Sequence, residues 1–267
     1  MKRYSIALLC LLAAPFSRAE TPVTDREQTL AFSGAELHAL AAAAFADTLD
    51  QMRRRRELDR DARLLRKTRA IAGRLVAQAI KLKPESAHWN WELHLTDAAD
   101  VDAYSMAGGK LLLGTAFLRR AHLSEAELAI LIGHEIGHVI AEHVREQATA
   151  VLLRNPKNPR RTLSDIIAEM NMDLSVYLQL MPMSRMQEVE ADQIGVRLAA
   201  MAGFPPVAAL TFYDKLARFD AGSGASVLDT HASPRMRTRI APALAADSAP
   251  VYRRALLASG APGYVFR

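Results

Sequence analysis

The sequence has a single cysteine, Cys10, which lies within the first ten residues. A disulfide framework needs cysteine pairs, so the chain is not one of the small disulfide-stapled folds. After the N-terminus it also lacks any apolar run of about twenty residues, the length that spans a bilayer, and it shows no internal repeat. Its 267 residues are nevertheless enough to bury a core.

Residues 1–19 have the composition of a secretory signal peptide. Two basic residues precede an apolar run over residues 4–14, and Ser17 and Ala19 have the small-residue spacing of a cleavage site. The run is too short to span a bilayer comfortably. We therefore expect cleavage after Ala19 and a periplasmic location for the rest of the chain.

The N-terminus also bears on lipidation and charge. Cys10 follows Leu9, whereas a bacterial lipoprotein signal has a small residue there, so a lipoprotein is not expected. Cleavage would remove Lys2, Arg3 and Arg18 from the 34 basic residues and none of the 29 acidic ones, lowering the net charge from +5 to +2. So small an excess gives no support for nucleic-acid binding.

Residues 20–267 are predicted to form one domain. A helical segment over residues 34–83 ends at Pro84. Alternating residues then indicate short strands that form a small antiparallel sheet, with Gly108–Gly109 as a hairpin turn. Next comes a helix of five or six unbroken turns, which opens at Ser124.

Two further helices are expected in the second half of the chain. One covers residues 163–180, and the chain then passes through Met181–Met183 into a helix that ends at Gly203. Residues from about 85 to 240 are expected to form the catalytic core. Residues 241–267 are weakly patterned and are predicted to be a C-terminal tail.

The helix after Ser124 contains the motif HEIGH, in which His134 and His138 are four residues apart. Residues at this spacing share one helix face and can direct two imidazoles at one ion. HExxH is the arrangement of zinc proteases, in which the intervening carboxylate, Glu135, takes a proton from the attacking water. The neighbouring residues are apolar, so we expect the helix to be buried.

A zinc site of this type needs a third protein ligand. His143 lies half a turn around a continuous helix from His134 and is not expected to bind the ion. Glu188 is the better candidate, because small residues beside it would let a second helix approach the first. Asp192, one turn later, would hydrogen-bond a ligand histidine. Glu190 remains the alternative ligand.

HEIGHVIAEH and SRMQEVEAD, together with the upstream DAYSMAGGKLLLGTAFL and the later AGFPP, resemble the HtpX-like and CAAX-prenyl-protease zinc metallopeptidases, peptidase family M48. The resemblance runs from about residue 85 to 240. It implies a mostly helical α+β fold of the gluzincin type, with the sheet packed beside the HExxH helix. It further implies one Zn²⁺ per chain on His134, His138 and Glu188, with Glu135 as general base.

The resemblance also extends to residues outside the ligand set. The strand containing Ala103, Tyr104, Ser105 and Met106 would be the edge onto which an extended substrate is laid. His231 matches a histidine that approaches the zinc in bacterial relatives, where it assists catalysis or holds the enzyme latent. Arg239 and Ile240 would belong to the same element. Ala232 replaces the usual proline, which leaves open that His231 is an ordinary loop histidine.

These features predict a periplasmic zinc endopeptidase that hydrolyses misfolded or unassembled envelope proteins. The alternative is a chaperone-like protein that holds unfolded clients over a latent or structural zinc site. The presence of Glu135 favours catalysis, because a structural site has no need of a base. Peripheral association with a membrane or envelope assembly through Arg53–Arg56 is a further alternative, although a solvated helix face is expected there.

Overall fold

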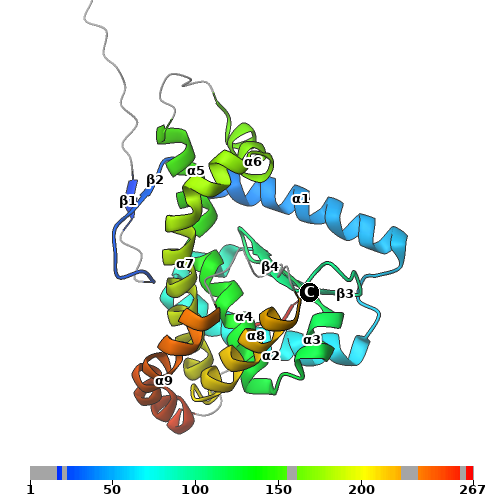
Figure 1. The fold of residues 1–267 in the computed structure, drawn as a ribbon, viewed down its shortest axis with the longest axis vertical. Coiled ribbons are helices and arrows are strands. Elements are labelled where there is room, and N and C mark those ends of the chain that lie inside the picture. Colours follow the sequence, from blue (N-terminus) through cyan, green and yellow to red (C-terminus); the bar gives the residue numbers. More distant parts are fainter. Residues whose placement is uncertain (1–16, 20–22, 155–160, 224–233, 259–262, 267) are drawn as a thin grey trace, which may run out of the picture.

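The computed structural model describes residues 17–19, 23–154, 161–223, 234–258 and 263–266. These residues confirm a mostly helical α+β fold with one small sheet beside the HExxH helix (Figure 1). Within those ranges, no helix is long and apolar enough to cross a membrane. His231 and most of the predicted signal peptide lie outside the described residues.

The sheet contains β3 (Glu92–Thr96), β4 (Ala103–Met106) and β5 (Lys110–Gly114), in the order β3-β5-β4. β4 and β5 form the predicted antiparallel hairpin, and both glycines of its turn, Gly108 and Gly109, have positive φ. β3 pairs with β5 in parallel, so the prediction of an entirely antiparallel sheet is wrong.

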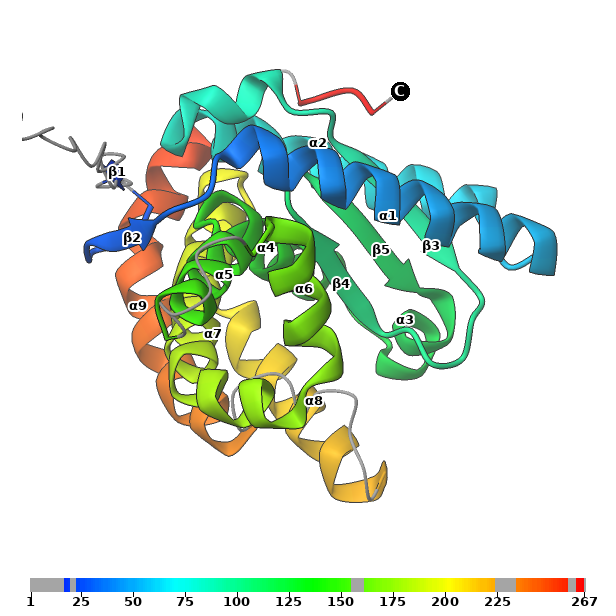
Figure 2. The ribbon, with the colours of Figure 1, turned by 90° about the horizontal axis from the view of Figure 1, so that it is seen from above.

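The central position of β5 explains this mixed topology. Its run of three leucines is buried on both faces of the sheet, as is usual for a strand with parallel pairing. Leu112 belongs to the same buried cluster as Phe45 of α1 (Gly34–Arg55), whereas Leu111 and Leu113 belong to the cluster that contains Leu75 of α2 (Ala62–Leu82). The second hairpin strand therefore takes the centre, between β3 and β4 (Figure 2).

The helical segment predicted over residues 34–83 is two helices, α1 (Gly34–Arg55) and α2 (Ala62–Leu82). Arg56 ends α1 in the left-handed conformation, and Asp61 begins α2 by accepting a hydrogen bond from the backbone of Leu64. Because of this break, the two helices pack on opposite faces of the sheet. The side chains of Arg53–Arg56 are exposed, as expected for a solvated face.

The HExxH helix, α4 (Glu125–Ile140), is shorter than predicted. The backbone breaks at Glu142, which has a φ of 54°, and a new helix, α5 (His143–Arg154), continues from there. Glu142 is held in place by the buried Lys83 at 2.8 Å and by Arg145 at 3.0 Å. His143 therefore does not lie on a continuation of α4, which changes its relation to the metal site.

The later helices also depart from the predicted boundaries. The break expected at Met181–Met183 occurs at Asp173, which caps the start of α7. The predicted tail lies largely within α9, so the boundary drawn after residue 240 falls inside a helix. The remaining elements are β1 (Ser17–Ala19), β2 (Gln28–Leu30), η1 (Pro84–His88), α3 (Thr115–Ala121), α6 (Leu163–Met172), α7 (Leu174–Met201), α8 (Ala208–Ser223) and α9 (Pro234–Leu257).

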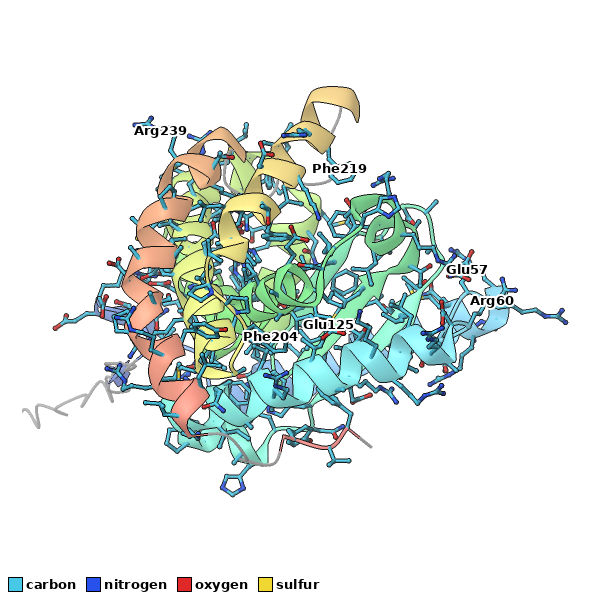
Figure 3. All side chains as sticks on the ribbon, turned by 90° about the horizontal axis from the view of Figure 1, so that it is seen from below. Glu57, Arg60, Glu125, Phe204, Phe219 and Arg239 are labelled. Atoms are coloured by element: carbon cyan, nitrogen blue, oxygen red, sulfur yellow. The ribbon has the colours of Figure 1, made fainter. Side chains whose placement is uncertain are left out.

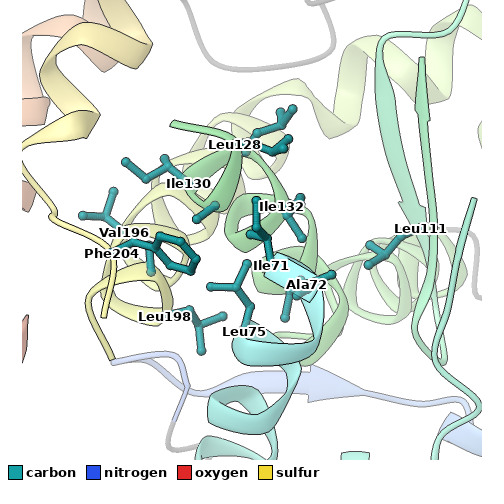
Figure 4. Packing of buried hydrophobic residues seen from close by; sticks show 14 of the residues in the cluster. Ile71, Ala72, Leu75, Leu111, Leu128, Ile130, Ile132, Val196, Leu198 and Phe204 are labelled. Carbon is teal, nitrogen blue, oxygen red and sulfur yellow. The ribbon is translucent and has the colours of Figure 1, made fainter. Parts of the chain in front are cut away.

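The core forms around α4. Its apolar side chains, among them Ile130 and Ile132, pack with Leu75 of α2 and Leu198 of α7 (Figure 4). Burial on nearly every side makes α4 a rigid support for the residues that it carries.

Glu127 attaches the start of α4 to α8. It is 3% exposed and accepts hydrogen bonds of 2.7 Å from Thr211, from Lys215 and from the backbone of Ser124. Burial alone would raise the pKa of Glu127, but these hydrogen bonds outweigh burial and hold the pKa below its ordinary value of 4.5. The ionised carboxylate therefore stabilises the fold fully above about pH 4.5, and this contribution is lost as the pH falls through the lowered pKa.

We expect Glu127→Gln to lower the free energy of unfolding by about 2 kcal/mol at neutral pH, because it removes charged hydrogen bonds from a buried site. The difference from the wild type should shrink as the pH is lowered toward about 4. Urea unfolding with a chelator present measures both effects. Glu125→Gln is the control, because Glu125 is exposed on the same helix turn (Figure 3) and should cost less than about 0.5 kcal/mol. Equal losses in the two variants would contradict the prediction.

Candidate metal centre

The structure brings the three predicted ligand residues together. His134 and His138 lie on α4 and Glu188 lies on α7, with one potential ligand atom of each within 4.8 Å of the others. The two Nε2 atoms are 3.1 Å apart. The Glu188 carboxylate lies 3.4 Å from Nε2 of His134 and 3.2 Å from Nε2 of His138.

These separations fit a zinc ion. Nitrogen and oxygen ligands lie about 2.0–2.2 Å from zinc, so two ligand atoms of a tetrahedral site are about 3.4 Å apart. The two histidine nitrogens are close to that separation, and each lies at a similar distance from one of the two oxygens of the Glu188 carboxylate, Oε2 for His134 and Oε1 for His138. Two imidazoles and one carboxylate are also the donor set of many catalytic zinc sites, which keep the fourth position for water or substrate.

Close packing of α4 against α7 produces this convergence. A Cβ at Gly133 would lie 2.6 Å from the carbonyl oxygen of Gly195, and a Cβ at Gly195 would lie 2.5 Å from the backbone nitrogen of His134. Only glycine permits such contact between the two backbones. Gly195 was among the small residues that predicted the approach, and it brings Glu188 within reach of the histidines.

Glu135 lies beside the ligand cluster and is not part of it. The side chain is 3% exposed, and its Oε2 accepts a hydrogen bond of 2.8 Å from the hydroxyl of Ser105 on β4. The same hydroxyl oxygen also lies 3.1 Å from the backbone carbonyl oxygen of Glu135. The strand next to the site thus fixes the orientation of the predicted base.

Asp192 lies beside the other ring nitrogen of the predicted ligand His134. Its Oδ1 lies 2.9 Å from Nδ1 of His134, and the carboxylate is fully buried. Arg237 on α9 also donates to it, with Nε 2.9 Å from Oδ2. A ligand histidine fixed in this way keeps one tautomer and one ring orientation.

Burial and charge set the protonation states around His134. Burial, and then the charge of Arg237, lower the pKa of His134 and favour the neutral imidazole that binds metals. Burial alone would raise the pKa of Asp192, but Arg237 and the hydrogen bond with His134 outweigh burial and lower it. The pair thus combines a neutral ligand with an ionised carboxylate.

Arg237 is the site residue that the sequence interpretation missed. The sequence analysis assigned Arg239 to the same element as His231. In the structure Arg239 is exposed on α9 (Figure 3), whereas Arg237 is 4% exposed. The signal for it in the sequence is the cluster of arginines in PRMRTRI, where Arg237 and Arg239 lie on different faces of a helix. His231, assigned to the same element, lies outside the described residues.

Neither Glu190 nor His143 belongs to the group of potential metal ligands, which contains Glu188 as the third residue. His143 is nevertheless close to the cluster: it is 1% exposed, and its Nδ1 lies 2.9 Å from Nδ1 of His138. The helix break at Glu142 redirects it toward the ligand. Burial lowers the pKa of His143 to about 4, so its ring is neutral at physiological pH.

The proposed substrate strand, β4, is an edge strand of the sheet and contacts α4. Two small hollows of about 20 Å³ each lie beside it. One is lined by Ala103, His134 and Glu135, and the other by Met106 and His138. An extended segment paired with β4 would therefore pass next to the metal ligands.

Comparison with known proteins gives one family and several relatives. The model of peptidase family M48 matches residues 59–246. The mitochondrial metalloendopeptidase OMA1 of Arabidopsis thaliana is 34% identical over 154 residues, which are 57% of this chain and 31% of that protein. The chain spans less than half the length of the OMA1 proteins that it matches.

Two bacterial proteins are also similar. The metalloprotease LoiP of Escherichia coli is 27% identical over 190 residues, which are 68% of this chain and 74% of that protein. The Beta-barrel assembly-enhancing protease of Yersinia pestis is 29% identical over 184 residues, covering 62% of this chain and 35% of that protein.

Proposed function

The chain belongs to peptidase family M48, and on this basis we propose that it is a zinc-dependent endopeptidase acting on unfolded or misfolded proteins of the bacterial periplasm or cell envelope. The observation that carries the proposal is the triangle of His134, His138 and Glu188 with Glu135 beside it. A structural zinc site would be closed by four protein ligands and would need no adjacent carboxylate.

Glu135 is assigned the proton transfers. Zinc, when bound, supplies the positive charge that polarises the peptide carbonyl and makes water a better nucleophile. Glu135 accepts a proton from the attacking water and passes it to the leaving amine. Because Ser105 engages Oε2, we assign the proton to Oε1.

The substrate class follows from β4. An edge strand recognises the backbone of an extended segment by strand addition, which is sequence-tolerant. Folded proteins rarely expose such segments, whereas unfolded ones do. The signal-peptide composition of residues 1–19 supports a periplasmic location, and the names of the relatives in Escherichia coli and Yersinia pestis support protease activity in bacteria.

Metal removal tests the proposal. The purified chain, loaded with one equivalent of zinc, should cleave an unfolded reporter protein, lose activity on dialysis against a chelator, and regain it when zinc is restored. Cleavage that survives chelation would contradict a metalloprotease. If the zinc-loaded chain binds the unfolded protein without cutting it, the chaperone-like alternative is favoured.

A further inference from the structure

A continuous series of polar contacts leads away from the metal ligand His138. Its Nε2 faces the other two ligands, and its Nδ1 lies 2.9 Å from Nδ1 of His143. On the far side of the His143 ring, Nε2 lies 3.4 Å from Oε2 of Glu190, within ion-pair distance but without hydrogen-bond geometry. His143 is thus placed between a metal ligand and a carboxylate.

Glu190 is in turn held by Arg26, which comes from the segment Val23–Leu30 near the N-terminus. Nε and Nη2 of Arg26 donate to the two carboxylate oxygens of Glu190, each at 2.8 Å. The guanidinium also makes a second bidentate contact, with the carboxylate of Glu146 on α5. Two parallel hydrogen bonds to each carboxylate fix the orientation of both acids.

A second side chain of the same segment fixes it beside the helix break. Gln28 is 1% exposed, and its amide donates to the carbonyl oxygen of Ala141 at 2.8 Å and to Glu146 at 3.2 Å. Gln187 donates to the same Glu146 oxygen at 2.8 Å and to the carbonyl of His143 at 3.3 Å. The segment therefore contacts both helix ends that flank the break, the end of α4 and the first turn of α5.

We propose that His143 and Arg26 are positioning residues for the ligand His138, and that the segment Val23–Leu30 is thereby part of the support of the metal centre. The inference rests on the zinc site of the proposed function. A histidine that binds metal through Nε2 carries its proton on Nδ1. His138 then donates to Nδ1 of His143, which places the proton of His143 on Nε2, facing Glu190.

The two ligand histidines thus have parallel supports. His134 is oriented by the buried Asp192, and Arg237 of α9 donates a hydrogen bond to the other oxygen of that carboxylate. His138 is oriented by His143, which lies between it and Glu190, and Arg26 donates hydrogen bonds to Glu190. In both cases an arginine from a distant part of the chain supplies the positive charge. Such partners of ligand histidines change metal affinity by about 10–100-fold when they are removed.

Three substitutions test the contact with His138 and its anchor. In His143→Asn, the side-chain oxygen can occupy the position of Nδ1 and still accept the hydrogen bond. His143→Leu has a similar size but no acceptor. Arg26→Gln releases Glu190 without touching the ligand. Arg53→Gln is the control, because Arg53 is exposed and pairs with Asp50 of the same helix. All are made in the full chain.

The readouts are the zinc dissociation constant from chelator competition and the visible spectrum of the Co²⁺-substituted protein, with urea unfolding of the metal-free protein as a check on folding. We expect His143→Leu to weaken zinc about 10–100-fold and to alter the cobalt spectrum. Arg26→Gln should weaken zinc in the same direction. His143→Asn should weaken zinc less than His143→Leu, because it keeps the acceptor for His138 but loses the contact with Glu190. Arg53→Gln should stay within about threefold of the wild type.

Two results would overturn the inference. One is a folded His143→Leu variant that binds zinc as tightly as the wild type, and the other is an Arg26→Gln variant with unchanged zinc affinity. A loss in His143→Asn equal to that in His143→Leu would also count against it, because the hydrogen bond would then be irrelevant. Failure of the wild type itself to bind zinc would instead contradict the proposed function.

Discussion

Replacing Glu135 by glutamine is expected to abolish most proteolysis while zinc binding persists. Glutamine has nearly the same size and keeps an oxygen that can accept the hydrogen bond from Ser105, but it cannot take up a proton at neutral pH. Loss of a general base costs about 10²–10⁴-fold in rate. We therefore expect kcat/KM for an unfolded reporter to fall by at least about 100-fold.

Measuring the zinc bound by the Glu135→Gln variant distinguishes loss of the general base from loss of the metal. Glu135 is not among the clustered ligand residues, so Glu135→Gln should still bind one zinc with an affinity within about threefold of the wild type. Glu125→Gln on the same helix should retain full activity. If the zinc-loaded Glu135→Gln variant cleaved at the wild-type rate, the proton transfers would have to be assigned to another group.

The sequence was most informative where the chemistry is local. HExxH places two histidines on one helix face by helical geometry, so the motif was enough to predict that His134 and His138 converge. Glu188 was predictable because small residues at the same helix face, including Gly195, indicated close packing. These inferences need only helical periodicity and the size of side chains.

The contacts that support the ligands depend on tertiary structure and could not be read in this way. The position of His143 beside His138 follows from the break at Glu142, a residue without an obvious turn signal. Arg26 reaches the site because β2 packs with α5, a contact between residues more than a hundred positions apart. The parallel pairing of β3 with β5 is likewise set by the order of strands in space, and the sequence analysis predicted only antiparallel pairing here.

Removal of Arg237 is expected to have the largest effect on stability. Arg237 and Asp192 form a buried ion pair, with side chains 5% and 0% exposed. Removing one partner leaves the other charge buried without compensation, which costs about 3–5 kcal/mol. We expect Arg237→Met to lower the free energy of unfolding of the metal-free protein by that amount in urea. Arg237→Lys should lower the free energy of unfolding by less, because it keeps the positive charge although it loses the bidentate geometry.

A double variant distinguishes the role of this pair in folding from its role at the metal. In Asp192→Leu with Arg237→Met, no charge remains unpaired, and buried ion pairs replaced by apolar side chains of similar volume are often near neutral in stability. The double variant should therefore be more stable than Arg237→Met alone. Zinc affinity should not recover, because His134 lacks its acceptor in the double variant, and a loss of about 10–100-fold is expected. Recovery of both quantities together would show that Asp192 acts only on the fold and does not orient the ligand.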